Sequence, residues 1–162
     1  MADVTVYGFP VSTFVNIVRL VLTEKYIPFT FHDLESVMGK AAHLALHPFN
    51  RVPILDHGGF RVYETQAIAS YVDEAFPGRA LAPAQPRDRA RMWQWISMVN
   101  SYYYPYIAFH LGHERIIFPA LGVEPDEKVV ATAVPKVAVG LRVLEEQLSA
   151  SGRYLLDRKS VV

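Results

Sequence analysis

Residues 51–68 read RVPILDHGGFRVYETQAI, and this stretch decides the fold. Two short strand-like runs, VPIL and FRVY, flank the turn residues 56–59, a pattern that predicts an antiparallel β-hairpin. The second run leads into a helix that Thr65 caps, because apolar residues recur at the i, i+3, i+4, i+7 spacing from Ile68. The stretch therefore predicts two adjacent strands followed by a helix.

A strand-helix-strand pattern precedes the hairpin. Residues 5–8 read as a short strand, and residues 12–25 read as a helix with Ser12 or Thr13 at its N-cap position. Residues 29–32 alternate like a second strand, and residues 34–46 are predicted as a short irregular helix. The predicted order up to the end of the third helix is β-α-β-α-β-β-α.

The sequence changes in character after this helix. Residues 78–87 are predicted as a linker, because they are rich in Pro and Ala and have no periodicity. Two helical patterns follow, one from Asp88 to about Tyr104 and one from about Asp126 to Leu148.

The second of these helices carries an apolar seam at alternating four- and three-residue spacing, formed by Val130, Val134, Val137, Leu141, Leu144 and Leu148. Pro135 lies inside the pattern and should kink the helix or displace its start. The fold class is therefore predicted as a small mixed sheet with helices packed on it, an α+β domain over residues 1–77, followed by an all-α domain over residues 88–162.

Composition excludes several classes of function. Sixteen basic and sixteen acidic residues give a formal net charge of zero, which does not favour nucleic acid as a partner. The chain has no Cys, so a catalytic protein thiol, a disulfide and a thiolate metal site are all excluded. No apolar run is long enough to span a bilayer, and the first ten residues lack a secretory signal pattern. We therefore predict a cytoplasmic protein without a membrane partner.

Three motifs together resemble a known family. The VYGFPVS, RVPIL and YETQAI segments are similar to those of the cytosolic glutathione S-transferases, and Pro10–Ser12 is most similar to the serine-type phi class. The resemblance is close over residues 4–76 and looser beyond them. It implies a thioredoxin-like N-terminal domain, a helical C-terminal domain, a homodimer, and glutathione as co-substrate without a prosthetic group.

The resemblance assigns most of a glutathione site to the opening stretch. Pro53 would be a cis-proline that lets the backbone of Val52 pair with the cysteinyl part of glutathione. Glu64 and Thr65 would hold the γ-glutamyl end. Glu64 supplies a charge for its ammonium, and Thr65 stands at a helix N-terminus, where free N–H groups favour a carboxylate. The alternative is an N-cap Thr beside a solvated Glu.

The glycine carboxylate of glutathione needs a cation or a hydrogen-bond donor of its own. By resemblance, Lys40 is the candidate for this contact. Arg51 stands where the family commonly has Gln, and it either assists the contact or is a solvated surface residue.

Ser12 is the candidate catalytic residue. By resemblance, its hydroxyl donates a hydrogen bond to the sulfur of glutathione and, with the positive end of the first helix, lowers the thiol pKa from about 8.5. The alternative is a plain N-cap serine, and Thr13 is a second candidate for the role. Aligning on Pro10 puts Gly8, not Tyr7, at the position of the catalytic tyrosine of other classes, so Tyr7 is predicted to lie in the core.

An electrophile pocket is expected between the two domains. Aromatic faces suit planar apolar substrates, and some of the candidate residues are expected to be core instead. The candidates are Phe9, Phe14, Tyr102, Tyr106 and Phe109, with Tyr103 and Tyr104 beside them.

Two further signals are interpreted without a catalytic role. Phe49 is either an interface key of the dimer or a locally buried residue. His110 and His113 are three apart, but further ligands are not obvious, so we predict no metal site and treat them as interdomain or surface histidines.

The leading hypothesis is an enzyme that joins the thiol of glutathione to hydrophobic electrophiles. A glutathione-dependent peroxidase is a variant of the same thiolate chemistry, and a non-catalytic interaction module of the same fold is the alternative from another class. Family members continue after the segment resembling residues 154–157 into a capping box and a buried helix. Residues 88–162 are therefore expected to form a partial helical domain, because the sequence stops at residues 160–162, within this box.

Overall fold

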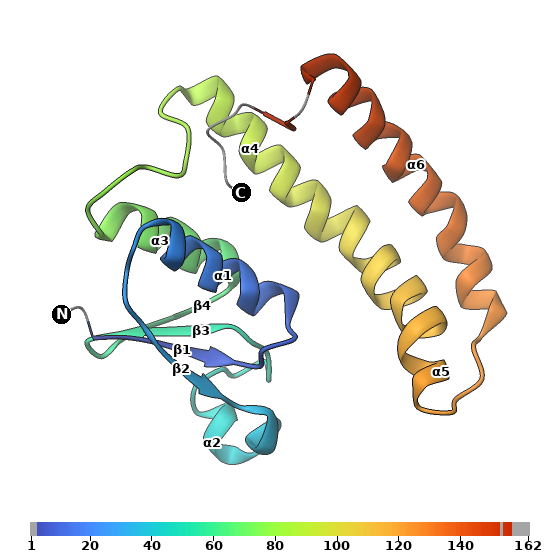
Figure 1. Ribbon diagram of the computed structural model, residues 1–162. Coiled ribbons are helices and arrows are strands. Elements are labelled where there is room, and N and C mark those ends of the chain that lie inside the picture. Colours follow the sequence, from blue (N-terminus) through green and yellow to red (C-terminus); the bar gives the residue numbers. More distant parts are fainter. Residues whose placement is uncertain (1–2, 153, 157–162) are drawn as a thin grey trace. The chain divides into compact units, whose positions relative to one another are not determined.

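The structure is a computed structural model that describes residues 3–152 and 154–156. The chain divides into two compact units, of which the first ends at Ala82 and the second begins at Pro83. Residues 160–162, where the sequence predicts half of a capping box, lie outside the described residues. Figure 1 shows the elements of both units.

The first unit is built on a four-stranded mixed sheet with the strand order β2-β1-β3-β4. β1 runs parallel to β2 and antiparallel to β3, and β4 runs antiparallel to β3. The strands are β1 (Val4–Gly8), β2 (Thr30–Asp33), β3 (Ile54–His57) and β4 (Phe60–Tyr63). The predicted hairpin and the predicted thioredoxin-like mixed sheet are therefore confirmed.

The hairpin turn is shorter than predicted. Asp56 and His57 pair with Arg61 and Phe60 and so belong to the strands, not to a four-residue turn. The turn proper is Gly58–Gly59, whose φ angles of 58° and 89° are both positive. Two positive φ angles define the turn type that matches the twist of a two-residue hairpin, and glycine adopts them without a steric penalty.

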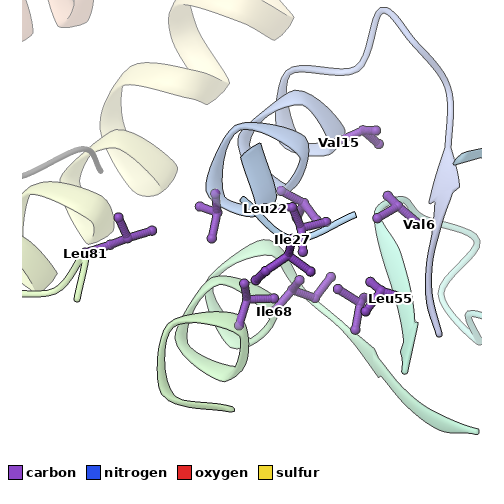
Figure 2. Close-up of a cluster of buried hydrophobic side chains, with 11 residues drawn as sticks. Val6, Val15, Leu22, Ile27, Leu55, Ile68 and Leu81 are labelled. Atoms are coloured by element: carbon purple, nitrogen blue, oxygen red, sulfur yellow. The ribbon is translucent and has the colours of Figure 1, made fainter. Parts of the chain in front are cut away.

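Two helices, α1 (Thr13–Glu24) and α3 (Thr65–Ala75), cover one face of this sheet (Figure 1). Their apolar stripes and the inward-facing residues of β1 and β3 form one core (Figure 2). Its members include Val4, Val6, Val15, Val18, Leu22, Leu55, Ile68 and Val72.

Gly8 lets α1 approach β1 closely. A Cβ atom added to Gly8 would lie 2.4 Å from Cγ2 of Val15, a separation that real Cβ atoms do not show. Val15 is fully buried and its branched side chain has few rotamers to move into. The missing side chain of residue 8 is thus what allows the first turn of α1 to pack on the strand.

The segment between β2 and β3 differs from the single irregular helix that the sequence predicts. It contains a 3₁₀ turn, η1 (Glu35–Val37), and a separate short helix, α2 (Ala41–Leu44). His43 lies in α2 and His47 follows it, and both side chains are almost completely buried. The segment therefore has its own polar interior, which its sequence pattern did not predict.

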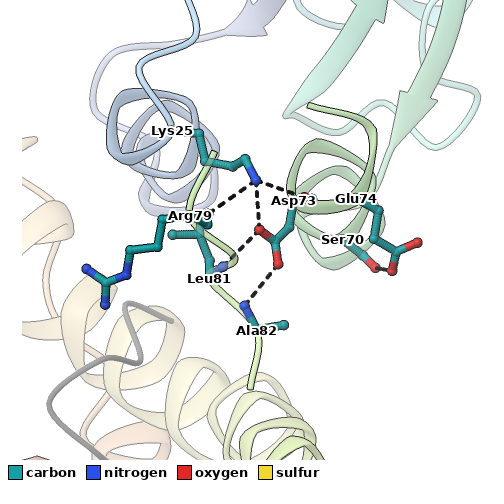
Figure 3. Close-up of polar contacts among 7 residues, drawn as sticks. All are labelled: Lys25, Ser70, Asp73, Glu74, Arg79, Leu81 and Ala82. Carbon is teal, nitrogen blue, oxygen red and sulfur yellow. Dashed lines mark hydrogen bonds and ion pairs between the residues drawn. The ribbon is translucent and has the colours of Figure 1, made fainter. Parts of the chain in front are cut away.

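The predicted linker is anchored to the first unit over its first half. Lys25 at the end of α1 is buried and donates to the carboxylate and the carbonyl oxygen of Asp73 and to the carbonyl oxygen of Arg79 (Figure 3). The same carboxylate accepts the backbone N–H groups of Leu81 and Ala82 at 2.8 and 2.9 Å. Leu81 belongs to the buried core, so this stretch is ordered despite its lack of periodicity.

The second unit begins with a helical run much longer than predicted. Helix α4 (Pro86–Met98) continues as a π-helix, η2 (Val99–Ile117), and ends in the short α5 (Phe118–Ala120), whereas the sequence predicts an end near Tyr104. The backbone N–H of Phe118 reaches the carbonyl oxygen of His113, five residues back, as a π-helix requires. A window tuned to a 3.6-residue period does not detect this wider turn.

Helix α6 (Glu127–Ser151) forms the second long element, and Asp126 caps it by accepting from the N–H of Lys128 at 2.8 Å. Pro135 lies inside the helix and does not displace its start.

The predicted seam of α6 is partly wrong. Val134 and Leu141 are about half exposed, at 51% and 52%, while the small residues Ala133 and Gly140 occupy the inward positions. A Cβ at Gly140 would lie 3.2 Å from the ring of Tyr103, whose hydroxyl donates to the Gly140 carbonyl oxygen at 2.8 Å. Helix α6 packs closely on η2, so the inward positions are occupied by small residues. A pattern based on large apolar residues does not identify these positions.

Within the described part of the chain, no helix is long and apolar enough to cross a membrane.

Candidate functional site

The loops that carry the predicted glutathione contacts meet at one end of the sheet. Tyr7 near the end of β1 pairs with Ile54 at the start of β3, and Ile54 pairs with Tyr63 at the end of β4. The segments that follow β1, precede β3 and follow β4 therefore lie side by side at this edge. They are the segments that contain Ser12, Val52–Pro53 and Glu64–Thr65.

Helices α1 and α3 both begin at this same end, because β1 and β4 run in the same direction and each leads into its helix. The N-terminus of a helix carries unpaired N–H groups and the positive end of the helix dipole. No acidic side chain lies in the first turn of either helix. The edge therefore presents two positive helix ends, of which that of α3 follows directly after the carboxylate of Glu64, and helix ends of this kind suit anionic groups.

Ser12 occupies the predicted N-cap position of α1. Its Oγ accepts a hydrogen bond from the N–H of Val15 at 3.4 Å, and its own N–H donates to the carbonyl oxygen of Phe9. The side chain is half-buried. Because the oxygen serves as acceptor in the cap, the hydroxyl proton is the part that can donate to a further group.

The Val52–Pro53 peptide bond is cis, as predicted from the sequence. Pro53 is buried, and Val52 is half-buried and packs against the core of the first unit. The backbone of Val52 therefore lies at the edge of the sheet, directly ahead of the first paired residue of β3, Ile54.

Glu64, not Thr65, is the N-cap residue of α3, which corrects the prediction from the sequence. Glu64 has φ 72° and ψ 118°, a region that residues with a Cβ rarely occupy, and its side chain is exposed. Such strained backbone concentrates at functional sites, where surrounding structure holds it. Thr65 is the first helical residue and is half-buried, so it stands among the free N–H groups of the first turn.

The two cationic candidates are both exposed. Lys40 donates through Nζ to the carbonyl oxygen of Ser36 at 2.8 Å, so its ammonium is turned back onto its own loop. Arg51 is exposed, and its carbonyl oxygen accepts a hydrogen bond from Nε2 of His43 at 2.9 Å. Arg51 is the neighbour of Val52 in the sequence. The binding of the glycine carboxylate of glutathione by Lys40 or Arg51 stays a prediction.

Two buried histidines, His43 and His47, were missed by reasoning from the sequence. His43 uses both ring nitrogens: Nδ1 accepts from the N–H of Gly39 at 3.4 Å and Nε2 bonds to the carbonyl oxygen of Arg51. A carbonyl oxygen can only accept, so Nε2 carries the proton and Nδ1 does not. The signal available in the sequence was two histidines four residues apart in the apolar context AAHLALHPF.

The charge of Glu64, the residue predicted to bind the γ-glutamyl end of glutathione, affects the pKa of His47. Its Nδ1 accepts from the N–H of Phe49 at 3.3 Å, and its ring packs on Tyr63 with centroids 4.3 Å apart. Burial is the largest cause of its lowered pKa; Glu64 opposes this effect, and His43 and Arg51 lower the pKa further. His47 is therefore a neutral packing residue beneath this edge of the sheet.

Two residues of the first unit depart from their predicted environments. Tyr7 is half-buried and stacks on His32 with ring centroids 5.3 Å apart, outside the buried core where the sequence placed it. Phe49 is 70% exposed, so the alternative of a locally buried Phe is wrong. Its role as an interface residue stays a prediction.

The predicted electrophile-pocket residues occupy different environments. Phe9 and Phe14 are half-buried near the start of α1, and Tyr102 is 63% exposed. Tyr106 accepts a hydrogen bond from Nζ of Lys136 at 2.8 Å, and that ammonium lies 4.4 Å from the ring centroid. Phe109 lines a cavity of about 570 Å³ within the second unit.

His110 and His113 follow Phe109 on η2. No group of three or more His, Cys, Asp or Glu side chains among the described residues could hold a metal ion. His110 and His113 line the cavity instead, together with the buried Glu114.

Comparison with known proteins agrees with the geometry. The family described as "Glutathione S-transferase, N-terminal domain" matches residues 6–80. Glutathione S-transferase F7 of Arabidopsis thaliana is 30% identical over 164 positions, which cover 98% of this chain and 78% of that protein. Glutathione S-transferase 3 of Zea mays is 32% identical over 162 positions, covering 96% of this chain and 71% of that protein.

A solved structure is similar to the chain over nearly its whole length. Glutathione transferase F2 from Populus trichocarpa superposes with a TM-score of 0.84 at 27% identity, over 98% of this chain and 75% of that one. The F-type names of these relatives agree with the phi class predicted from Pro10–Ser12. Taken with the sheet order, the cis peptide bond and the paired helix N-termini, these similarities show that the chain belongs to the glutathione S-transferase family.

Proposed function

We propose that this chain is an enzyme that joins the thiol of glutathione to hydrophobic electrophiles. One observation carries the proposal: the loops holding Ser12, Val52–Pro53 and Glu64–Thr65 meet at one edge of the sheet, where α1 and α3 both begin. Glutathione is an anion with a reactive thiol near its middle. Two positive helix ends, one for the thiolate and one for a carboxylate, match that charge pattern.

Ser12 acts on the thiol of glutathione and forms no covalent bond itself. The thiol releases its proton to solvent, the sulfur anion accepts a hydrogen bond from the Ser12 hydroxyl, and the N-terminus of α1 adds a favourable dipole. Both effects lower the thiol pKa from about 8.5, which raises the thiolate fraction at neutral pH. The thiolate then attacks the electrophilic carbon, a C–S bond forms, and the leaving group departs with its electron pair.

The γ-glutamyl end lies at the start of α3. Glu64 is exposed and faces solvent at the edge, where its carboxylate pairs with the ligand ammonium. The ligand carboxylate accepts from the free N–H groups of the first turn, beginning at Thr65. The unusual φ of 72° at Glu64 turns its backbone so that this side chain and the helix N-terminus serve the same ligand group.

The remaining contacts complete the ligand. The backbone of Val52 pairs with the cysteinyl unit ahead of Pro53, and the glycine carboxylate is bound by Lys40 with Arg51 beside it. Lys40 reaches the ligand by leaving the Ser36 carbonyl, an exposed hydrogen bond that costs little to exchange.

Aromatic side chains receive the electrophile. Phe9 and Phe14 flank Ser12 in the sequence, and Tyr106 and Phe109 lie on η2. Tyr102, at 63% exposure, contributes least surface to a dry pocket. The same thiolate can attack an oxygen of an organic hydroperoxide and break its O–O bond, which releases the alcohol and oxidises the sulfur to a sulfenic acid. A second glutathione thiol then forms the disulfide and releases water, so a peroxidase activity is the second reaction of this site. We further propose a cytoplasmic homodimer, with the exposed Phe49 as an interface residue.

Two measurements test the proposal: retention on immobilised glutathione and conjugation of a chlorinated nitroaromatic substrate, for the wild type and for Ser12→Ala. We expect Ser12→Ala to keep retention, to lose most of its kcat, and to shift the rise of kcat/KM with pH to higher pH, because the thiol pKa moves back towards its ordinary value. Thr13→Ala is the matched control, since Thr13 is the exposed neighbour in the same turn.

The outcomes separate the hypotheses. Retention without conjugation by the wild type would support the non-catalytic module. Full activity of Ser12→Ala together with loss in Thr13→Ala would move the thiolate donor to Thr13. Absence of retention in the wild type would contradict glutathione binding altogether.

A further inference from the structure

Two polar side chains of α1 connect this helix to the loop that precedes it. Asn16 and Arg19 lie three residues apart, on one face of the helix. Asn16 is exposed, yet both ends of its amide are bonded. Its Nδ2 donates to the carbonyl oxygen of Pro10 at 2.9 Å, and its Oδ1 accepts from Nη1 of Arg19 at 3.0 Å.

The chemistry of these two partners fixes the orientation of the Asn16 amide. A carbonyl oxygen only accepts and a guanidinium only donates, so a reversed amide would place donor against donor and acceptor against acceptor. Arg19 is half-buried, and its guanidinium carbon lies 5.3 Å from the ring centroid of Phe31 in β2. This cation–π contact holds Arg19, which therefore serves as a fixed support for Asn16.

The carbonyl group that Asn16 binds lies in the turn before Ser12. The N–H of Ser12 donates to the carbonyl oxygen of Phe9 at 3.1 Å, which closes a β-turn. Pro10 and Val11 are the central residues of this turn. The backbone N–H of Asn16 also donates to the carbonyl oxygen of Ser12 at 3.0 Å. Asn16 thus holds the turn on both sides of Val11.

The capping bond of Ser12 gives its hydroxyl group only weak support. Oγ accepts from the N–H of Val15 at 3.4 Å, which is longer than the usual range of about 2.7–3.2 Å for N–H donors. The direction of the hydroxyl group therefore depends mainly on the backbone of residues 10–12, and this is the backbone that Asn16 binds.

We propose that Asn16 is a positioning residue for Ser12: its amide holds the Pro10 carbonyl and, through the turn, directs the Ser12 hydroxyl towards the sulfur of glutathione. The inference rests on the proposed function, because it names the residue that places the proposed thiolate donor. Without the Asn16 contact the turn moves, the hydrogen bond from Ser12 to the sulfur weakens, and the thiol pKa rises towards its ordinary value of about 8.5.

The pKa of the thiol of bound glutathione tests the proposal, and the ultraviolet difference absorbance of the thiolate as a function of pH measures it. Asn16→Leu keeps the approximate size of the side chain and removes its hydrogen bonds. We expect this variant to raise the thiol pKa by about 0.5, so that the thiolate fraction below the pKa falls about threefold. Leucine is a good helix former, so the variant should fold as the wild type does.

Thr23→Val is the matched control. The hydroxyl of Thr23 donates to the carbonyl oxygen of Arg19 at 2.8 Å on the exposed surface of the same helix. The control variant therefore also loses an exposed side-chain hydrogen bond of α1, but none that reaches the turn, and it should keep the wild-type thiol pKa.

Adding Asn16→Leu to Ser12→Ala tests whether Asn16 acts through Ser12. We expect no further rise in the thiol pKa, because the hydroxyl group that Asn16 positions is already absent. An equal rise in both backgrounds would overturn the proposal, and so would an unchanged pKa in Asn16→Leu when Ser12→Ala raises it. An unchanged pKa in Ser12→Ala would contradict the proposed function itself, so the two failures are distinguishable.

Discussion

Nε2 of His43 donates to the carbonyl oxygen of Arg51 at 2.9 Å, across a loop of eight residues. The other ring nitrogen accepts from the N–H of Gly39, so the imidazole joins both ends of the segment that begins beside Lys40 and leads into Val52. His43 is fully buried, and its two ring nitrogens bond to backbone atoms of Gly39 and Arg51. It is therefore a positioning residue for the strand entry.

We expect His43→Asn to raise the KM for glutathione about tenfold with a smaller change in kcat, because the shorter amide can replace Nδ1 but cannot reach the Arg51 carbonyl. His43→Gln extends its amide to the place of Nε2 and should keep KM near the wild-type value. Steady-state kinetics over a range of glutathione concentrations checks both. Equal KM values in the two variants, with equal thermal stability, would show that the Arg51 contact does not position the site.

The backbone of Glu64 predicts opposite effects on stability and on binding. Glu64→Gly removes the Cβ at a φ of 72° and should raise the free energy of unfolding by about 1 kcal/mol, while it abolishes retention on immobilised glutathione. Glu64→Gln keeps the strain, removes the charge and should weaken retention without stabilising the fold. Tyr26→Gly is the control, because Tyr26 also has a positive φ, 56°, and is exposed. It is distant in the sequence from the residues predicted to bind glutathione. It should stabilise the fold and leave retention unchanged.

The buried pair of Lys25 and Asp73 predicts a large and asymmetric loss of stability. Asp73→Ala leaves the buried ammonium of Lys25 without its carboxylate and frees two backbone N–H groups of the linker, so we expect a loss of about 3–5 kcal/mol. Lys25→Met keeps an apolar side chain of similar length, and Asp73 retains its two backbone donors, so the loss should be smaller. Urea unfolding measures both. A larger loss in Lys25→Met would contradict this assignment.

The same carboxyl sets an acid dependence of stability. Burial alone would raise the pKa of Asp73, but the N–H groups of Ala82 and Leu81 and the charge of Lys25 outweigh it, so the pKa is lowered. A carboxyl with a lowered folded pKa stabilises the fold above its unfolded pKa of about 3.9, and this contribution is lost as pH falls through the folded value. As the pH is lowered from about 5, the free energy of unfolding should fall more steeply for the wild type than for Asp73→Asn. Parallel curves would exclude this role for Asp73.

Gly140 predicts a site where a better helix former destabilises the protein. Gly140→Val adds side-chain atoms where even a Cβ lies 3.2 Å from the Tyr103 ring, so we expect a loss of about 1–3 kcal/mol despite improved helix propensity. Ala138→Val, on the exposed face of the same helix, should cost less than 1 kcal/mol. Thermal unfolding distinguishes the two, and equal losses would mean that η2 yields to the larger side chain.

The parts of the fold that the sequence predicts are those with local signals. The hairpin and the Ser12 cap follow from turn and capping chemistry, which acts over a few residues, and the cis bond before Pro53 is what the family resemblance implies. The missed features depend on contacts distant in the sequence. Gly140 faces η2 because the Tyr103 hydroxyl donates to its carbonyl oxygen. Leu81 is held in place because its N–H group donates to the carboxylate of Asp73.

The candidate site divides in the same way. Short motifs were enough to assign Ser12 and Glu64 to one site. The segments that contain them follow β1 and β4, and these two strands end at the same end of the sheet. The burial of His43 could not, because a histidine is polar by type and its two partners, at residues 39 and 51, are identified only by the folded loop. The π-helical turns of η2 have no periodic signature that a 3.6-residue window detects.

The contact between Gly8 and Val15 limits how this chain can change over evolutionary time. Tyrosine-using relatives, aligned on Pro10, carry their thiolate donor at position 8. In this chain a side chain at position 8 would clash with Val15. Exchanging the proposed serine donor for a tyrosine would therefore require at least two coordinated substitutions, a smaller residue at 15 together with the new one at 8. The packing of one helix turn thus separates the two kinds of thiolate chemistry in sequence space.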